Sequence, residues 1–452
     1  MSGENNRMKT GRQLRVASLI ALALVAVLSG CKSGSKGRAK TPTVGERTPI
    51  LSRIESGAKV DPSLDSVAVI LPPATANSEW AQGGGNAGKS YGHLALAENP
   101  SRVWTAQIAG STTRQRLAAA PVISDGKLYV MDTDGVVHAF DAQSGAHLWT
   151  KSFAVSGNSS KSVFGGGVSV EGDKLYVTTG LGEVAALNAS DGSQLWTKKP
   201  GGPLRGSPTI GFNAVYVMSQ DNQIFALNAA DGAVLWNESG SLTQSGVFGV
   251  AAPAAGQGTV IAGYASGELV AYRYENGRQL WSDALARTSI ATEVGSLTDV
   301  DADPIIDRGR VYALGQGGRM AAYELVTGQR IWELNLAGIS TPAIVGDWVF
   351  TLDDHAEILA IARTTGKVRW LTQLSRYHNE KKRKGPIFWV GPVLAGNKLW
   401  VGNSRGELGT IDPGTGAFAK YLDIKDPISL APVVANQTLY VLDDSGLISA
   451  YR

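Results

Sequence analysis

Short β-rich apolar runs, separated by polar and glycine-containing turns, recur from about residue 99 to the C-terminus. Each run centres on a large apolar or aromatic residue, as in Leu128-Tyr129-Val130, and successive centres lie 38 to 51 residues apart. Runs of this composition, bounded by turn residues, predict β-strands, and their regular recurrence predicts a repeat architecture. The eight central residues are Tyr129, Tyr176, Tyr216, Ile261, Tyr312, Phe350, Trp400 and Tyr440.

Other positions of the repeat also keep one residue type. A proline lies eight residues before the centre in seven of the eight units. An alanine lies ten residues after the centre in seven units, and a glycine lies sixteen after it in all seven units that extend so far. A tryptophan lies twenty residues after the centre in six units, and Lys420 takes that position in the seventh. Because all length variation falls between units, the unit itself is the structural module.

One unit predicts four antiparallel strands. The expected strands open at Pro121 and cover residues 128–130, 136–141 and 147–153. Asp134-Gly135 favours a hairpin turn between the second and third strands, since glycine adopts positive φ without steric cost. Trp149, in the outer strand, is expected to fill the gap between adjacent sheets. Four strands in about 44 residues are typical of a propeller blade, so we expect an all-β, eight-bladed β-propeller.

The eighth unit ends at Arg452 after its third strand. Residues 102–105 match the tryptophan-bearing outer strand and precede the first full unit. We therefore expect this N-terminal strand to pair with residues 447–452 and close the ring, which would remove an exposed sheet edge.

The N-terminal residues differ from the repeats. A basic segment is followed by thirteen apolar residues, 16–28, too few for the ~20 that span a bilayer. They resemble the apolar core of a signal peptide, whether translation starts at Met1 or Met8. Leu28-Ser29-Gly30-Cys31 resembles a bacterial lipobox, and Cys31 is the only cysteine of the chain. We expect a signal peptide over residues 1–30, a lipidated Cys31 with a flexible tether and lead-in over 31–98, and the propeller over 99–452.

Composition removes several classes of function. The net charge is +3, and residues 1–30 carry all of it, so a nucleic-acid partner is not expected. With one cysteine, the chain has neither an intrachain disulfide nor a cysteine-based metal site.

The repeat resembles the tryptophan-docking repeat of the quinoprotein propellers, as in the segment from Ala186 to Trp196. Two branches of that group matter: the quinoprotein dehydrogenases, and the BamB family of outer-membrane assembly lipoproteins. The lipobox, the compact blades and the length favour the BamB family. Lys32 and Ser33, in place of an aspartate after the cysteine, imply the outer membrane.

Two local motifs carry the resemblance further. The segment 204–208, Leu-Arg-Gly-Ser-Pro, and the segment 297–301, Leu-Thr-Asp-Val-Asp, resemble two motifs of the BamB family. In that family these motifs help bind the BamA subunit, which implies partner-binding roles for Leu204, Arg205, Asp299 and Asp301. A further leucine of the family pattern is replaced by Gly202. The resemblance also implies other assembly lipoproteins, and unfolded outer-membrane clients, as partners.

The repeat places these motifs on one face. Arg205 lies three residues before Pro208 and Asp301 three before Pro304, the same repeat position in the third and fifth blades. We expect both loops to open on the same face, with side chains outside the core whose substitution costs the fold little. Solvated loop charges are the alternative.

The motifs that would indicate an enzyme lack their context. Residues 88–92 match G-x-S-x-G, but lie in a glycine-rich lead-in and not in a strand-turn-helix. The sequence from Asp299 resembles a calcium loop, but its sixth residue is Pro304 and its twelfth Arg310. We expect no enzymatic activity, no cofactor and no metal. The alternatives are a periplasmic quinoprotein-like dehydrogenase and a cell-wall glycan-binding propeller.

A basic insertion separates the sixth and seventh units. Residues 376–384 contain five lysines or arginines and one acid, Glu380. Contact with a partner protein or with anionic lipid, and a merely solvated loop, are both compatible with this composition.

The lipobox can be tested directly. Cys31→Ser removes the acyl acceptor, and stable anchoring needs more than one chain at about 0.8 kcal/mol per buried CH₂. We expect the variant to enter the soluble fraction or to stay unprocessed, as followed by membrane fractionation and mass spectrometry. Normal processing with continued outer-membrane fractionation would contradict the lipobox.

Overall fold

The computed structural model describes residues 57–153, 164–241, 251–285 and 299–452, all within the unit formed by residues 54–452. Cys31 and the expected signal peptide lie outside the described residues. The described chain is built from strands, with one short 3-10 helix, η1 (Pro62–Leu64). None of the helical structure in these ranges is long and apolar enough to cross a bilayer.

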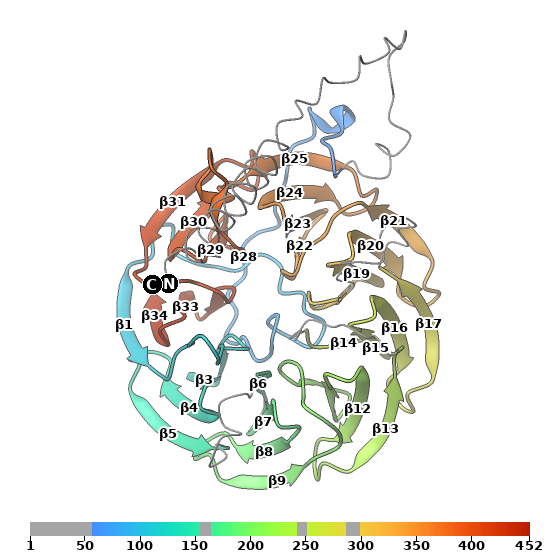
Figure 1. The fold of residues 1–452 in the computed structure, drawn as a ribbon, viewed down its shortest axis with the longest axis vertical. Helices are drawn as coiled ribbons and strands as arrows, with labels where there is room; N and C mark the ends of the chain where they lie inside the picture. The colour runs from blue at the N-terminus through green and yellow to red at the C-terminus, as the bar shows by residue number, and fades with distance from the viewer. Residues whose placement is uncertain (1–56, 154–163, 242–250, 286–298) are drawn as a thin grey trace, which may run out of the picture. The chain divides into compact units, whose positions relative to one another are not determined.

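Eight four-stranded antiparallel sheets form the ring seen in Figure 1. Blade one comprises β2 (Val122–Ser124), β3 (Lys127–Met131), β4 (Val136–Asp141) and β5 (His147–Ser152). Blade two comprises β6 (Gly166–Glu171), β7 (Lys174–Thr179), β8 (Val184–Asn188) and β9 (Gln194–Lys198). Blade three comprises β10 (Thr209–Gly211), β11 (Ala214–Met218), β12 (Gln223–Asn228) and β13 (Val234–Ser239). Blade four comprises β14 (Ala254–Gly256), β15 (Thr259–Gly263), β16 (Glu268–Arg273) and β17 (Gln279–Ala284).

The second half of the ring repeats this order. Blade five comprises β18 (Ile305–Asp307), β19 (Arg310–Gly315), β20 (Arg319–Glu324) and β21 (Arg330–Leu334). Blade six comprises β22 (Ala343–Val345), β23 (Trp348–Leu352), β24 (Glu357–Ala362) and β25 (Val368–Gln373). A two-stranded hairpin, β26 (Tyr377–Asn379) and β27 (Lys384–Pro386), precedes blade seven. Blade seven comprises β28 (Trp389–Ala395), β29 (Lys398–Asn403), β30 (Glu407–Ile411) and β31 (Phe418–Asp423). The expected fold class is confirmed.

The N-terminal strand closes the ring. Blade eight has the order β1-β34-β33-β32, so β1 (Arg102–Gln107) supplies its outer strand. The other members are β32 (Val433–Ala435), β33 (Thr438–Leu442) and β34 (Leu447–Tyr451). In the antiparallel register of β1 and β34, Trp104 lies opposite Ala450. The predicted closure is confirmed.

The outer-strand tryptophan of one blade docks on the next blade. A Cβ added to Gly145 of blade one would stand 2.5 Å from the ring of Trp104, so only glycine leaves room for the indole. The indole N–H of Trp104 donates to the carbonyl oxygen of Ala142 at 3.2 Å. This arrangement recurs at Trp149 on Gly192, Trp196 on Gly232, Trp236 on Gly277, Trp281 on Gly328, Trp332 on Gly366 and Trp370 on Gly416. The glycine and tryptophan positions of the repeat are therefore the two halves of one contact between blades.

In four blades, a polar residue three positions after the repeat centre holds the next hairpin turn. In blade one the carboxylate of Asp132 accepts from the backbone N–H groups of Asp134 and Val136, both at 2.9 Å. Asp353, Asn403 and Asp443 accept two backbone N–H groups in the same way. These buried side chains are thus explained by the turns that they stabilise.

The lead-in is an ordered part of the propeller from residue 57 onward. Figure 1 shows this light-blue segment crossing the middle of the ring. Seven blades share hydrogen bonds with it at their innermost strands, and on blade six Pro72 packs against Gly346. The hydrogen-bonded pairs are Trp80 with Ile123, Ala81 with Val170, Gln82 with Ile210, Ala87 with Ala255, Gly88 with Ile306, Leu94 with Leu394, and Asn77 with Val434. The expected lead-in is therefore bonded to the blades from residue 57 onward, and the stretch expected to be a flexible tether lies outside the described residues.

Upstream of this crossing, residues 57–69 lie along the outer strand of blade six. Val60 forms a parallel bridge with Val368, and the N–H of Asp61 donates to the Val368 carbonyl at 2.9 Å. Lys367 pairs with Asp61 at 3.0 Å. The guanidinium of Arg369 donates to the carbonyls of residues 65 and 67. The chain thus enters the propeller at the rim of blade six.

The docking contact predicts an asymmetric effect of two neighbouring substitutions. Trp104→Ala removes a buried indole that joins blade eight to blade one, and should lower the free energy of unfolding by about 3–5 kcal/mol. Val103→Ala, at a side chain that is 48% exposed, should change it by no more than about 0.5 kcal/mol. Chemical denaturation measures both. Equal effects would show that the docking does not stabilise the ring.

Candidate binding site at the propeller axis

A funnel opens at the axis of the ring. All eight blades contribute residues that precede or begin their innermost strands, and the lead-in contributes Trp80, Gly83, Gly84 and Tyr91. The lead-in pairs with the distal parts of the innermost strands, so it forms the floor of the funnel. Trp80 and Tyr91 pack there with their ring centroids 4.8 Å apart. The funnel is consequently a recess with a mostly apolar lining.

A buried ion cluster lies beside the funnel. The Nη2 of Arg205, before β10 in blade three, donates to Asp299 at 2.8 Å and to Asp301 at 3.1 Å, both before β18 in blade five. Arg205 and Asp299 are each 1% exposed, and Asp301 is 10% exposed. Burial, and repulsion by Asp299, raise the pKa of Asp301 to about 6, against the attraction of Arg205. The cluster therefore joins two loops that are separated by blade four.

A second buried cation lies near the same group of carboxylates. Lys89 of the lead-in is 1% exposed, and its ammonium donates to the Gly83 carbonyl at 2.8 Å and to the Thr209 hydroxyl at 3.0 Å. Burial lowers the pKa of Lys89, and attraction to Asp303 opposes that shift. Asp303 accepts from the N–H of Ala252 at 2.8 Å, and burial raises its pKa. Two cations and three carboxylates thus meet where blades three, four and five approach the axis.

The structure brings three of the four predicted partner-binding residues together. The prediction that the two loops open on one face is confirmed, since Arg205 bonds both aspartates directly. The prediction that these side chains lie outside the core is wrong. Leu204 is fully buried and packs with Ile210 and Phe225. Arg205 and Asp299 are buried because each neutralises the other, and burying either alone would leave an uncompensated charge.

The remaining motifs of the lead-in have structural roles. In the G-x-S-x-G match, the hydroxyl of Ser90 donates to Asp307 at 2.9 Å. His93 contacts the Pro72 carbonyl through Nδ1 and receives the N–H of Asn397 at Nε2. The Asp307 carboxylate that accepts from Ser90 also pairs with Arg363, and His93 contacts Pro72 and Asn397, so these side chains connect the lead-in to the blades.

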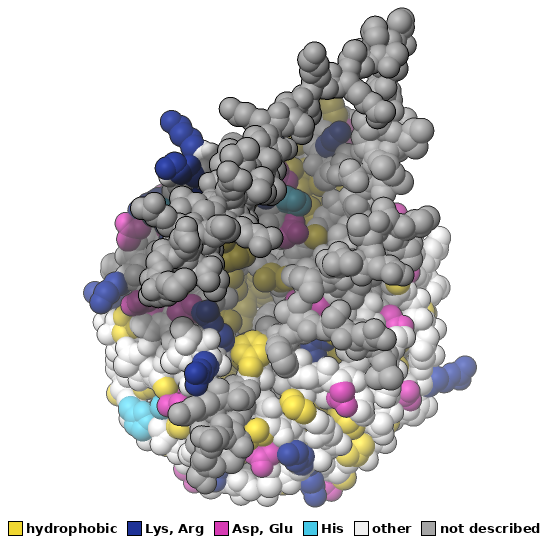
Figure 2. All heavy atoms as spheres, in the orientation of Figure 1, with side chains coloured by type: hydrophobic (Ala, Val, Ile, Leu, Met, Phe, Trp, Pro, Cys, Tyr) yellow, Lys and Arg dark blue, Asp and Glu magenta, His cyan; other side chains and the backbone are white. Residues whose placement is uncertain are grey.

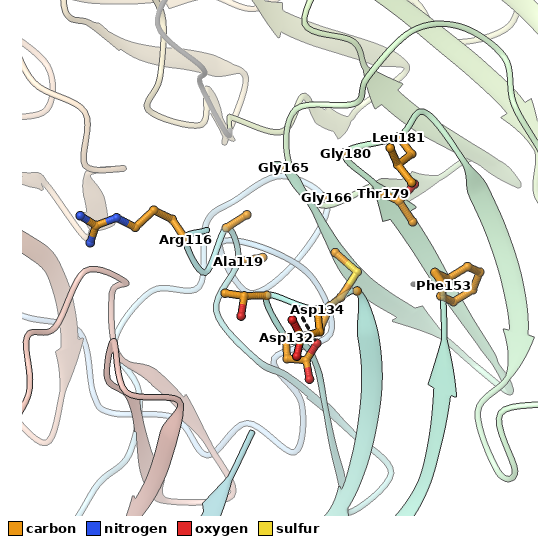
Figure 3. Close-up of a pocket in the computed structure, with 14 residues that line it drawn as sticks. Arg116, Ala119, Asp132, Asp134, Phe153, Gly165, Gly166, Thr179, Gly180 and Leu181 are labelled. Atoms are coloured by element: carbon orange, nitrogen blue, oxygen red, sulfur yellow. Dashed lines mark hydrogen bonds between the residues drawn. The ribbon is translucent and has the colours of Figure 1, made fainter. Parts of the chain in front are cut away.

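A second, smaller pocket lies between blades one and two. Figure 3 shows Asp132 and Asp134 beneath it, with Arg116 reaching away from them. The Asp132 carboxylate holds its own turn and contacts His138 Nε2 at 2.8 Å. This carboxylate is already used by the fold, and the pocket is a consequence of the repeat.

Sequence reasoning missed Lys89, Asp303 and Trp80. A lysine inside a glycine-rich lead-in carries no periodic signal, and its burial depends on blades more than a hundred residues away. In the sequence, Asp303 stands out only as the fifth residue of the segment from Asp299 that resembles a calcium-binding loop.

The fold and the axis together define the class: an eight-bladed propeller of tryptophan-docking repeats, with a closed funnel and an internal ion cluster at its axis. A family model described as "Outer membrane protein assembly factor BamB" matches residues 89–163 and 133–372. This chain belongs to the BamB family.

Individual BamB proteins are similar to this chain over most of its length. The BamB of Aliivibrio fischeri is 34% identical over 78% of this chain and 89% of its own length. The BamB of Salmonella typhimurium is 29% identical over 78% and 88%. Among solved structures, BamB from Moraxella catarrhalis has a TM-score of 0.66 at 20% identity, covering 78% of this chain and 99% of that one. Quinohemoprotein alcohol dehydrogenase from Comamonas testosteroni has a TM-score of 0.65 at 14% identity, covering 84% and 81%, which shows a shared fold.

The burial of Arg205 reverses the expected effect of its substitution. Arg205→Ala leaves two buried carboxylates without their cation, and should lower the free energy of unfolding by about 3–5 kcal/mol. Adding Asp299→Asn and Asp301→Asn should restore much of that loss, because no buried charge then remains unpaired. Thermal and chemical denaturation measure both variants. An unchanged melting temperature for Arg205→Ala would show that the cluster does not stabilise the fold.

Proposed function

We propose that this protein is a non-enzymatic assembly factor for outer-membrane β-barrel proteins, which binds a BamA-like subunit. The observation that carries the proposal is the similarity to proteins named as assembly factors, which extends over the propeller and covers nearly nine-tenths of those relatives. A propeller suits this role because it presents many loops from a rigid ring.

The protein acts at the periplasmic face of the outer membrane, held by acyl chains on Cys31. The lipobox-like sequence and the names of the relatives support this location. Other assembly lipoproteins and unfolded barrel clients are further partners under this proposal.

The ion cluster suggests how the partner site is built. Asp301 is the part-exposed member, and it lines the funnel together with Asp303. Under this proposal Asp301 contacts the BamA-like subunit, whereas Leu204, Arg205 and Asp299 are positioning residues that hold its loop. Direct contact by those three would require the buried cluster to open.

The axial funnel does not suit the quinone of the dehydrogenases. Pyrroloquinoline quinone carries three carboxylates, so a site for it needs cationic side chains that balance their charge. The described lining of the funnel offers the carboxylates Asp301 and Asp303 and no lysine or arginine. Lys89 is not part of this lining, and its ammonium donates to the Gly83 carbonyl and the Thr209 hydroxyl.

A charge-only substitution tests the partner site. Asp301→Asn keeps the shape of the side chain and leaves the pair of Arg205 with Asp299, so the melting temperature should change little. Binding to the BamA-like subunit should weaken at least about tenfold, as measured by affinity capture from detergent-solubilised membranes and by titration with the purified subunit.

The matched control is Glu171→Gln, an exposed acid at the end of β6. It should bind normally. If wild type captures no barrel-assembly subunit, the assembly role is wrong. If Asp301→Asn binds as wild type does, the role stands and the assigned contact is wrong.

A further inference from the structure

The basic insertion between blades six and seven is an ordered hairpin. Tyr377 pairs with Pro386 and Asn379 with Lys384, and the N–H of Ile387 donates to the Arg376 carbonyl at 2.8 Å. The side-chain amide oxygen of Asn379 accepts from the N–H of Lys382 at 3.0 Å. The insertion is thus a built projection and not a loose connection.

Glu380, the acid of the hairpin, accepts hydrogen bonds from backbone N–H groups and does not pair with the lysines or arginines of the hairpin. One carboxylate oxygen of Glu380 accepts from the backbone N–H groups of Arg376 at 2.8 Å and Tyr377 at 3.0 Å. Lysine and arginine side chains at positions 381–384 are exposed, and none makes an ion pair with a described acidic residue. In Figure 2, Lys and Arg side chains project from the rim near β25 and β31. A rigid turn therefore presents four unpaired cations to solvent.

Apolar surface accompanies this charge. Phe388, which follows the hairpin, is 65% exposed, and the guanidinium of Arg376 lies 5.8 Å from the centroid of the Tyr377 ring. Aromatic and cationic side chains together are typical of surfaces that contact the interfacial region of a bilayer.

The entry point of the chain lies in the same sector. Residues 60–69 lie alongside β25 in space, and the hairpin begins four residues after β25 ends. A strand of six residues is about 20 Å long, so the two features flank one outer strand. The 25 residues between Cys31 and residue 57 can span at most about 90 Å. An anchor at Cys31 would therefore leave this rim within reach of the membrane, and contacts made by the rim itself would decide which edge faces the bilayer.

We propose that the β26–β27 hairpin, with Phe388, is a membrane-contact element that binds anionic phospholipid head groups and turns the rim of blades six and seven toward the bilayer. The membrane is favoured over an acidic protein because the charge, the exposed aromatic residue and the chain entry share one edge. Each cation near an anionic surface adds a screened attraction. The inference does not depend on the assembly role.

The test uses residues 31–452 carrying Cys31→Ser, which lack the acyl chains but retain the unit formed by residues 54–452. Co-sedimentation is measured with vesicles of phosphatidylethanolamine and phosphatidylglycerol, and with purely zwitterionic vesicles. We expect binding to the anionic vesicles alone, with a strong decrease on adding salt. Replacement of Lys381, Lys382, Arg383 and Lys384 by serine should weaken it at least about tenfold.

A matched control removes the same charge elsewhere. Arg114→Ser, Lys198→Ser, Lys199→Ser and Arg278→Ser neutralise four exposed cations away from blades six and seven, and this variant should bind nearly as wild type does. Equal losses in the two variants would overturn the proposal in favour of diffuse attraction. Absence of vesicle binding by the parent protein would also overturn it, and loss of a captured protein partner in the hairpin variant would then assign the hairpin to that partner.

The orientation has its own readout. Because Cys31 is the only native cysteine, Lys382→Cys in the Cys31→Ser chain gives one labelling site for an environment-sensitive dye. Gln194→Cys on β9, in blade two across the ring, provides the comparison. Anionic vesicles should blue-shift the dye at 382 and not at 194. Equal shifts would overturn the edge-on contact.

Discussion

The propeller depends on the contact between the tryptophan of one blade and the glycine of the next. The indole occupies the space that a side chain at the glycine position would fill, and its N–H binds a backbone carbonyl of the neighbouring blade. Seven such contacts join consecutive sheets. Blade seven has Lys420 at the position of the tryptophan, so no such contact joins it to blade eight among the described residues. Ring closure by β1 then makes the series continuous from blade eight to blade one.

The axis is stabilised by different means. At the centre of the ring, the lead-in forms hydrogen bonds with backbone groups of the innermost strands. Gln82 shows this directly, since its side chain bonds both the N–H and the carbonyl of Ile210. The same segment carries Lys89 beneath Asp303, so the polypeptide that closes the funnel also balances its charge. Arg205 joins the loops that precede the innermost strands of blades three and five, so a buried ion cluster is part of the structure near the axis.

The rim and the axis therefore suit separate tasks. At the axis, Arg205 holds a loop that brings two part-exposed carboxylates, Asp301 and Asp303, to the funnel, and under the proposed function Asp301 contacts the partner. At the rim of blades six and seven, cations are held on a rigid hairpin without internal partners. The two regions affect stability differently because the hairpin cations are exposed and Arg205 is buried. Neutralising the hairpin leaves no charge unpaired in the core, whereas removing Arg205 leaves buried carboxylates without their cation.

The sequence alone determined the repeat, the blade count, the strand order and the closing strand. Each depends on local patterns, such as the spacing of Gly145 and Trp149, that recur often enough to be recognised. It also indicated that the loops of Arg205 and Asp301 share a face. Only the tertiary structure decided that these side chains are paired with each other, that Lys89 is buried near Asp303, and that Trp80 lines the funnel. Burial depends on what distant segments place around a residue, and the lead-in occurs once, so no period in the chain marks it.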